Sequence, residues 1–151
     1  MTMDNAPLED QQIKHLEMIQ GVISRLANNS FLIKGWAITV TGAFLGFAVD
    51  ATDSALAVAS ALPTLAFWAL DTHFLRSERL FRALFDRART IPPGVEPFFM
   101  GGTSAAFVES ISGGPKPDLS SWWVTAARPT LALHYGGLLA SAGGVALAIG
   151  L

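Results

Sequence analysis

Two ionisable residues border the long apolar runs of this sequence, and their types and positions define a candidate site. Lys34 is the only charge in FLIKGWAITVTGAFLGFAV (31–49), and Asp71 ends the uncharged run ALAVASALPTLAFWAL (55–70). An ionisable group at the edge of hydrocarbon either faces a polar path or binds a group of opposite charge. We therefore expect Asp71 to line a permeation path, to bind Lys34 or an arginine, or to be an interfacial residue paired within its own helix.

A row of arginines follows Asp71 with the spacing of one helix face and defines a second candidate site. Glu78 and Asp86 lie four residues to either side of Arg82, so each can form a helical ion pair with it. Two interpretations are open: the face is solvated or rests on anionic headgroups, or, repeated around an oligomer, it binds a nucleotide, an oligonucleotide or a lipid headgroup. This arginine face consists of Arg76, Arg79, Arg82 and Arg87.

Few other side chains could do chemistry. His73 and His134, the latter beside Tyr135, are either proton-linked and pore-facing or amphipathic anchors at an interface. The sequence has no cysteine, no Walker loop, no G-x-S-x-G and no His-x-x-x-His motif. We predict a protein without enzymatic activity, metal or cofactor.

The composition indicates which elements must position these residues. The chain is 51% hydrophobic and only 15% charged, against roughly 25% charged residues in ordinary soluble domains. More apolar surface is present than one small core needs, which favours a membrane protein. We predict an all-α membrane protein with three transmembrane helices, an N-terminal amphipathic helix and a long cytoplasmic extension of the second span.

The apolar and polar patterns divide the chain into five segments. Asn28-Asn29-Ser30 is expected to separate the first two segments, and Pro63 is expected to kink the second span because it cannot donate to the carbonyl four residues back. The Gly- and Pro-rich stretch after Arg89 predicts a loop with a short strand pair around 95–100 and 105–111. The segments are a cytoplasmic amphipathic helix (1–29), a first span (30–50), a second span with its extension (54–89), a cytoplasmic loop segment (90–127) and a third span (128–151).

The basic residues predict an orientation. All 10 lysines and arginines precede or begin the first span or lie between the second and third, and the acidic link DATDS (50–54) has none. Because cytoplasmic loops carry the excess of Lys and Arg, we expect a multi-pass protein of the bacterial inner membrane with a cytoplasmic N-terminus and a periplasmic C-terminus.

Small residues at helical spacing occur in the first and third spans. Such faces allow close helix approach in lipid. They serve either packing within one chain or assembly, and because three spans bury few interior positions, we expect a homo-oligomer. The residues are Gly42 and Gly46 in the first span and Gly136, Ala140 and Gly144 in the third.

Two segments carry a resemblance to a known group of proteins. KHLEMIQGVISRLANNSFLIKGW (14–36) and PTLAFWALDTHFLRSERLFRALF (63–85) are similar to the patterns KHLxxIQxVIxRxxxNSFxxKGW and PxxxFWxLDxxFLxxERxFRxLF of small bacterial inner-membrane proteins of largely unassigned function. In architecture alone, the chain also resembles transmembrane effectors of anti-phage defence systems.

Together these features predict a function and its alternative. We expect a homo-oligomeric, channel-like or membrane-disrupting effector, controlled from its cytoplasmic face, whose partners are the lipid bilayer and a cytoplasmic protein, nucleotide or nucleic-acid signal. The alternative is a non-conducting membrane anchor or regulatory subunit for a soluble cytoplasmic partner.

Overall fold

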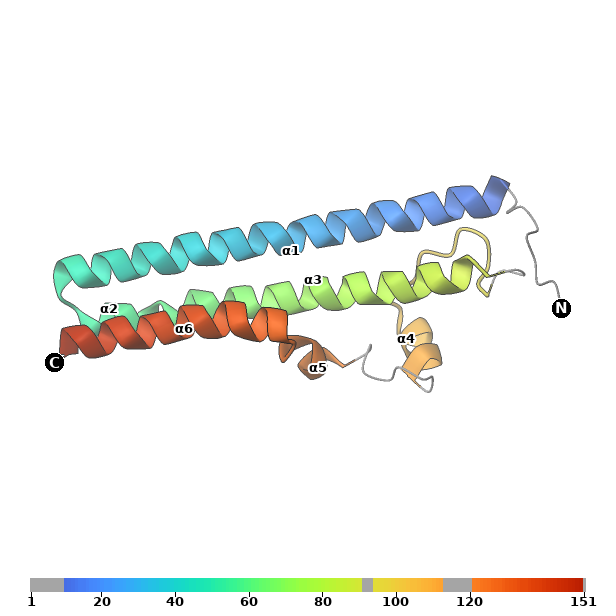
Figure 1. The fold of residues 1–151 in the computed structure, drawn as a ribbon. Coiled ribbons are helices and arrows are strands. Elements are labelled where there is room, and N and C mark those ends of the chain that lie inside the picture. Colours follow the sequence, from blue (N-terminus) through green and yellow to red (C-terminus); the bar gives the residue numbers. More distant parts are fainter. Residues whose placement is uncertain (1–9, 91–93, 113–120, 151) are drawn as a thin grey trace. The chain divides into compact units, whose positions relative to one another are not determined.

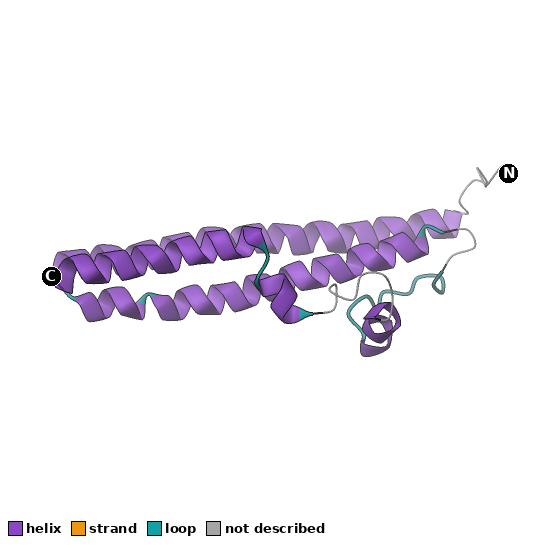
Figure 2. Ribbon diagram, turned by 60° about the horizontal axis from the view of Figure 1, so that its bottom comes forward, coloured by secondary structure: helices purple, strands orange, loops and turns teal. Residues whose placement is uncertain are grey.

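The computed structural model describes residues 10–90, 94–112 and 121–150, which form helices joined by turns, with no strand among them (Figures 1 and 2). The chain divides into two compact units, each described by itself. Unit 1 comprises Met1–Asn28 and Leu75–Ser121, and unit 2 comprises Asn29–Phe74 and Trp122–Leu151. The helices are α1 (Asp10–Ala51), α2 (Ser54–Ala59), α3 (Ala61–Ala88), α4 (Ala105–Ser112), α5 (Trp122–Ala126) and α6 (Pro129–Gly150).

Helix α1 runs without a break through Asn28-Asn29-Ser30, so the predicted interruption there is wrong. Asparagine and serine cost a helix interior less than about 0.7 kcal/mol each relative to alanine, and neither Gly nor Pro is present to stop it. Ser30 does not cap a second helix; its hydroxyl bonds Asp71 across to α3. The segments predicted at 1–29 and 30–50 thus share one helix, and residues 1–9 lie outside the described part.

The second long apolar run is interrupted at Ser60, which separates α2 from α3. Pro63 has no N–H to donate to the carbonyl of Ala59, which is where α2 ends. Nearby hydroxyls bond backbone oxygens at the interruption: Ser60 Oγ donates to the Ala57 carbonyl at 2.6 Å, and Thr64 Oγ1 donates to the Ser60 carbonyl at 2.8 Å. The expected effect of Pro63 is therefore a short break one turn before it.

The strand pair predicted around 95–100 and 105–111 is also wrong. Ala105–Ser112 is helix α4, and residues 94–100 form turns and irregular backbone. Ser104 starts the helix, because its Oγ accepts from Phe107 N at 3.3 Å and its carbonyl accepts from Val108 N at 2.9 Å. Within the predicted 90–127 loop, 91–93 and 113–120, with Lys116, lie outside the described residues.

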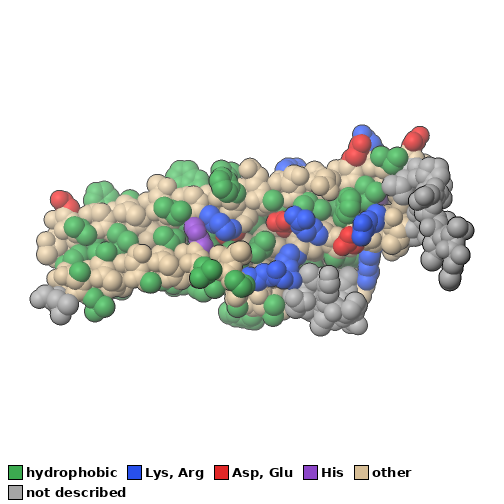
Figure 3. Space-filling view, in the orientation of Figure 1, with side chains coloured by type: hydrophobic (Ala, Val, Ile, Leu, Met, Phe, Trp, Pro, Cys, Tyr) green, Lys and Arg blue, Asp and Glu red, His purple; other side chains and the backbone are tan. Residues whose placement is uncertain are grey.

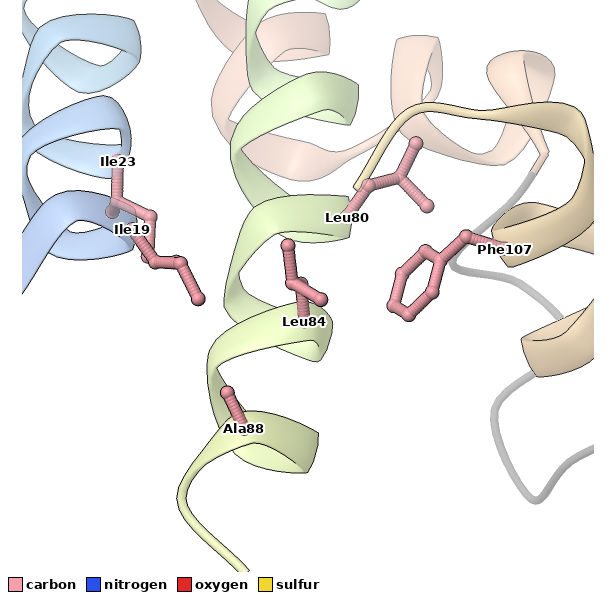
Figure 4. Close-up of a cluster of buried hydrophobic side chains, with 6 residues drawn as sticks. All are labelled: Ile19, Ile23, Leu80, Leu84, Ala88 and Phe107. Atoms are coloured by element: carbon pink, nitrogen blue, oxygen red, sulfur yellow. The ribbon is translucent and has the colours of Figure 1, made fainter. Parts of the chain in front are cut away.

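Unit 1 has a hydrophobic core formed by α1, α3 and α4 (Figure 4). Ile19 and Ile23 of α1 meet Leu80 and Leu84 of α3, and Phe107 of α4 closes the cluster. Each such side chain, fully buried, contributes about 1.5–3 kcal/mol. Within this unit, the N-terminal part of α1 therefore packs on the C-terminal part of α3.

Polar contacts tie the loop after α3 to α1. Gln12 Nε2 donates to the carbonyls of Ala88 at 2.7 Å and Thr90 at 3.0 Å. His15, which is buried, places Nε2 2.8 Å from the Phe99 carbonyl. Since a carbonyl only accepts, His15 Nε2 carries the proton. These bonds connect the end of α3 and Phe99 to α1 within unit 1.

Unit 2 has small and hydroxyl side chains inside and large apolar side chains outside. Ala37, Thr41 and Thr64 are 0% exposed, whereas Phe31 is 74% and Leu133 is 78% exposed. A soluble domain has the opposite distribution, and a helix bundle in lipid has this one.

Within the described residues, three helical segments are long and apolar enough to cross a membrane: Asp10–Ala51, Ser54–Ala88, which combines α2 and α3, and Pro129–Gly150. Their most apolar windows have mean hydropathies of 1.6, 1.4 and 1.4. On the face drawn in Figure 3, the charged side chains gather mainly over the parts of α1 and α3 that belong to unit 1. By helix length and hydropathy, the chain has the features of a multi-pass membrane protein.

Candidate functional site

The centre of the candidate site is the carboxylate of Asp71, which is 0% exposed in unit 2. Three donors from two other helices surround it. Lys34 Nζ lies 2.6 Å from Oδ2, Ser30 Oγ donates to Oδ1 at 2.5 Å, and Tyr135 Oη donates to Oδ2 at 3.0 Å. Lys34 Nζ also donates to Ser30 Oγ at 2.8 Å. We call Ser30, Lys34, Asp71 and Tyr135 the Asp71 site.

Helical geometry explains why these residues meet. Ser30 and Lys34 are one turn apart on α1 and therefore share a face. Asp71 follows the apolar run of α3, whereas Tyr135 lies in the second turn of α6, near the start of its apolar stretch. Ser30 and Lys34 likewise lie at the start of the apolar stretch of α1. The site joins three helices through one carboxylate.

The charges of Asp71 and Lys34 compensate each other, and this compensation requires both residues. Asp71 is negative and Lys34 positive, and the hydroxyls of Ser30 and Tyr135 supply further donors to the carboxylate. Removing one partner of a buried pair is strongly destabilising, because the other charge is left without compensation. The 27% exposure of the Lys34 side chain keeps part of its charge accessible. The site therefore joins three helices through contacts to one carboxylate.

A second polar contact lies deeper in unit 2. Thr41 Oγ1 and Thr64 Oγ1 are 2.8 Å apart, and both threonines are fully buried between α1 and α3. Thr64 also bonds the Ser60 carbonyl at the break between α2 and α3. Hydroxyls of the spans are thus satisfied inside one chain.

Aromatic side chains support the Asp71 site from one side. The rings of Trp68 and Tyr135 are stacked, with centroids 6.0 Å apart and planes inclined by 9°. Trp68 Nε1 donates to the Ala126 carbonyl at 3.2 Å and so joins α3 to α5. His134 packs edge-on against Tyr135, with centroids 4.8 Å apart, and its Nε2 is buried with no hydrogen-bond partner among the described residues. His73, in contrast, is exposed, with its ring against Phe74.

The arginine face lies on unit 1, and its members contact other residues of the chain. Arg82 Nη2 is 2.6 Å from Glu78 Oε1, as the spacing predicts, whereas Asp86 pairs with Arg89 at 3.2 Å. Arg87 donates to Ser110 Oγ at 2.9 Å and lies 5.4 Å over the Phe107 ring. Interaction partners also exist for Arg76 and Arg79.

Arg82 also lines a groove of about 410 Å³ between α1 and α3, together with Gln20, Ile23, Phe85 and Asp86. This groove carries both signs of charge. The carboxylate of Asp86 makes the groove less suited to bind an anion than a groove lined by arginines alone.

The small residues of the first and third spans have open space around them in unit 2. A Cβ atom added at Gly42, Gly46, Gly136 or Gly144 would meet no described atom within 4 Å. Gly42, Gly46, Ala140 and Gly144 are exposed, and Gly136 is half-buried.

Sequence reasoning pairs Lys34 or an arginine with Asp71 but omits Ser30 and Tyr135 from the site. A signal existed for Ser30, since it lies one turn before Lys34 on the same helix face. The expected interruption at Asn28–Ser30 concealed it. Tyr135 had no such signal, because the contact depends on the placement of α6.

The resemblance to small inner-membrane proteins, based on residues 14–89, stays a prediction. Comparisons with protein-family models, with curated proteins and with solved structures find no match to this chain.

Proposed function

We propose that this protein is a homo-oligomeric, channel-like or membrane-disrupting effector of the bacterial inner membrane, with the Asp71 site as the contact that keeps its spans closed. The observation that carries the proposal is the ion pair between Lys34 and the buried carboxylate of Asp71, 2.6 Å apart, at the edge of the apolar runs. Ionisable groups inside spans are costly and occur chiefly on functional paths and switches. Well-packed apolar residues at these positions would be as stable or more stable.

The burial of Asp71 favours a contact that keeps the spans closed over a residue that lines a pore. A carboxylate that is 0% exposed does not face a water-filled path in this arrangement. Lys34, at 27% side-chain exposure, is the accessible partner. A signal that separates the two residues would release α1 from α3 and α6, and the exposed charges would then admit water.

The outer small-residue faces support assembly. Gly42 and Gly46 on α1, and Gly144 on α6, have open space where a side chain would be. In lipid, such faces allow backbones of neighbouring helices to approach closely. Two different faces on one subunit favour a heterologous contact, α1 of one copy against α6 of the next, which closes into a ring.

Control belongs to unit 1 in this proposal, with the N-terminus and residues 75–121 in the cytoplasm. The basic residues of that region support the orientation through the positive-inside rule. A cytoplasmic protein, nucleotide or nucleic acid would act there. The architectural resemblance to anti-phage effectors extends the proposal to antiviral defence, in which membrane damage stops an infected cell.

The test is dye release from liposomes that contain the purified full-length protein. We expect slow release by the wild-type protein, faster release by the Asp71→Asn variant at protein-to-lipid ratios where oligomers form, and loss of that faster release when Gly42→Leu/Gly144→Leu is added. Ala43→Leu, at an exposed position, is the control and should leave the release by Asp71→Asn unchanged. Liposomes that stay sealed with the Asp71→Asn variant would contradict the proposal.

The second candidate is a non-conducting anchor for a soluble partner. One observation favours it: the buried hydroxyls of Thr41 and Thr64 bond each other within the same chain. Unit 1, with its own core, would then be the platform for the partner. Sealed liposomes together with a purified cytoplasmic partner that binds unit 1 stoichiometrically would establish the anchor.

A further inference from the structure

The groove of about 410 Å³ in unit 1 has two polar edges and an apolar floor. Gln20 and Ser24 line it from α1, and Arg82 and Asp86 line it from α3. Each pair is spaced four residues apart, so its side chains share one helix face and lie about 5–6 Å from each other. The remaining lining residues are buried or half-buried and form the floor: Ile23, Ala27 and Phe85.

The charged side chains at the α3 edge keep part of their hydrogen-bonding capacity. Arg82 donates to Glu78 through Nε and Nη2, and Asp86 contacts Arg89 through Oδ1. Their spacing would allow Arg82 and Asp86 to pair with each other, but each pairs with a different residue. Within the described residues, Arg82 Nη1 and Asp86 Oδ2 have no bonded partner. A donor and an acceptor thus remain at this edge of the groove.

The two opposite charges determine which ligand fits. A phosphate or another simple ion is attracted by one of them and repelled by the other. A neutral ligand that presents acceptors to the Arg82 guanidinium and donors to the Asp86 carboxylate satisfies both. The half-buried ring of Phe85 and the apolar floor around it add a surface on which a flat ring can stack.

Guanine carries these groups on one planar ring. Its O6 and N7 atoms accept hydrogen bonds from an arginine. Its N1–H and its 2-amino group, on the adjacent edge, are donors and match a carboxylate, which only accepts. Adenine has an amino donor in place of O6, so it would direct a donor at Arg82. The groove is also large enough, since small-molecule sites have volumes of about 300–1,000 Å³.

We propose that the groove binds the guanine base of a nucleotide, with Arg82 at O6 and N7 and Asp86 at N1 and the 2-amino group. Phe85 lies under the ring, and Gln20 and Ser24 on the opposite edge bind the ribose. This inference rests on the proposed function, in which a nucleotide acts on unit 1. Its test measures binding alone, so a missing guanine site and a missing leak are separate results.

Isothermal titration calorimetry of the full-length protein in detergent tests the assignment, with guanosine, adenosine and guanosine monophosphate as probes. We expect guanosine to bind about ten-fold or more tightly than adenosine, because adenine has a donor where guanine has O6. The Kd of guanosine monophosphate should lie within about three-fold of that of guanosine, since Asp86 offsets the attraction of Arg82 for phosphate. Absence of guanosine binding, equal binding of guanosine and adenosine, or a monophosphate that binds far more tightly than guanosine would overturn the proposal.

Two variants test the contacts, each with its own control. Asp86→Asn should weaken guanosine binding about ten-fold or more, whereas Arg89→Gln, which breaks the same ion pair but leaves the carboxylate in place, should not. Ser24→Phe fills the groove from an exposed position and should abolish binding, whereas Arg25→Phe, exposed and outside the lining, should retain it. Guanosine binding that is unchanged in Asp86→Asn or Ser24→Phe, or that is lost equally in the controls, would contradict the assignment.

Discussion

Lys34 Nζ and Asp71 Oδ2 lie 2.6 Å apart and join α1 to α3 in the apolar unit of the protein. Ser30 and Tyr135 complete the coordination of the carboxylate from α1 and α6. Three helices that otherwise present apolar surface are thereby connected through a single charge. The stability and the proposed closure of unit 2 both depend on this contact.

Replacing Asp71 with Asn should destabilise unit 2 by about 2–4 kcal/mol, because the ammonium of Lys34 loses its counter-charge beside hydrocarbon. Thermal unfolding of the detergent-solubilised protein measures the change as a lower Tm. Asp50→Asn, at an exposed position of α1, is the control and should leave Tm unchanged. Equal Tm values for both variants would show that the pair contributes nothing to the fold.

Replacing Tyr135 with Phe should cost less, about 1 kcal/mol, because one hydrogen bond to Asp71 is lost while the ring stays stacked on Trp68. The same unfolding measurement applies. In the Asp71→Asn background the additional cost should shrink, since the two residues share one interaction. Strict additivity of the two changes would argue against direct coupling.

The core of unit 1 yields a prediction that involves no charge. Leu84, 0% exposed between Ile19 and Phe107, should cost about 2–5 kcal/mol when changed to Ala. Hydrogen exchange should then accelerate in residues 10–28 and 105–112. Arg89→Ala, which breaks only an exposed pair with Asp86, should leave exchange unchanged.

Larger side chains on the small-residue face of α1, at Gly42 and Gly46, should disturb the assembly but not the fold of the single chain. A Cβ atom at Gly42 or Gly46 meets no described atom within 4 Å, so we expect the fold to tolerate leucine there. We expect a smaller particle in detergent by light scattering for either variant, and an unchanged particle for Ala43→Leu. Wild-type particle size in the glycine variants would place the subunit contact elsewhere.

Long apolar helices can be predicted from the sequence, whereas short elements and helix breaks depend on tertiary contacts. Long apolar runs bounded by Asp71, Arg128 and Pro129 specify three long helices, because length and hydropathy are local properties. The break at Asn28–Ser30 was predicted from weak local preferences, which the continuous contacts of α1 override. Helix α4 was missed because Val and Ile in a short apolar segment fit strand and helix alike.

The candidate site shows the same division. Lys34 and Asp71 stand out because each is an isolated charge beside a long apolar run. Their contact in space depends on the register of α1 against α3. The sequence alone leaves several partners open for Asp71. Tyr135 and Trp68 join the site through tertiary packing of α6 and α5, and no spacing along the chain indicates this.

Ion flux through liposomes carrying the Asp71→Asn variant tests the central claim most directly, with the wild-type protein and the charge-swapped Lys34→Asp/Asp71→Lys variant alongside. Loss of a contact worth at least 1.4 kcal/mol shifts a closed–open equilibrium by about ten-fold or more. We therefore predict a basal leak on the order of ten-fold above wild type for Asp71→Asn, and a return toward the wild-type rate in the swapped variant. A leak that is the same in all three proteins would contradict the account.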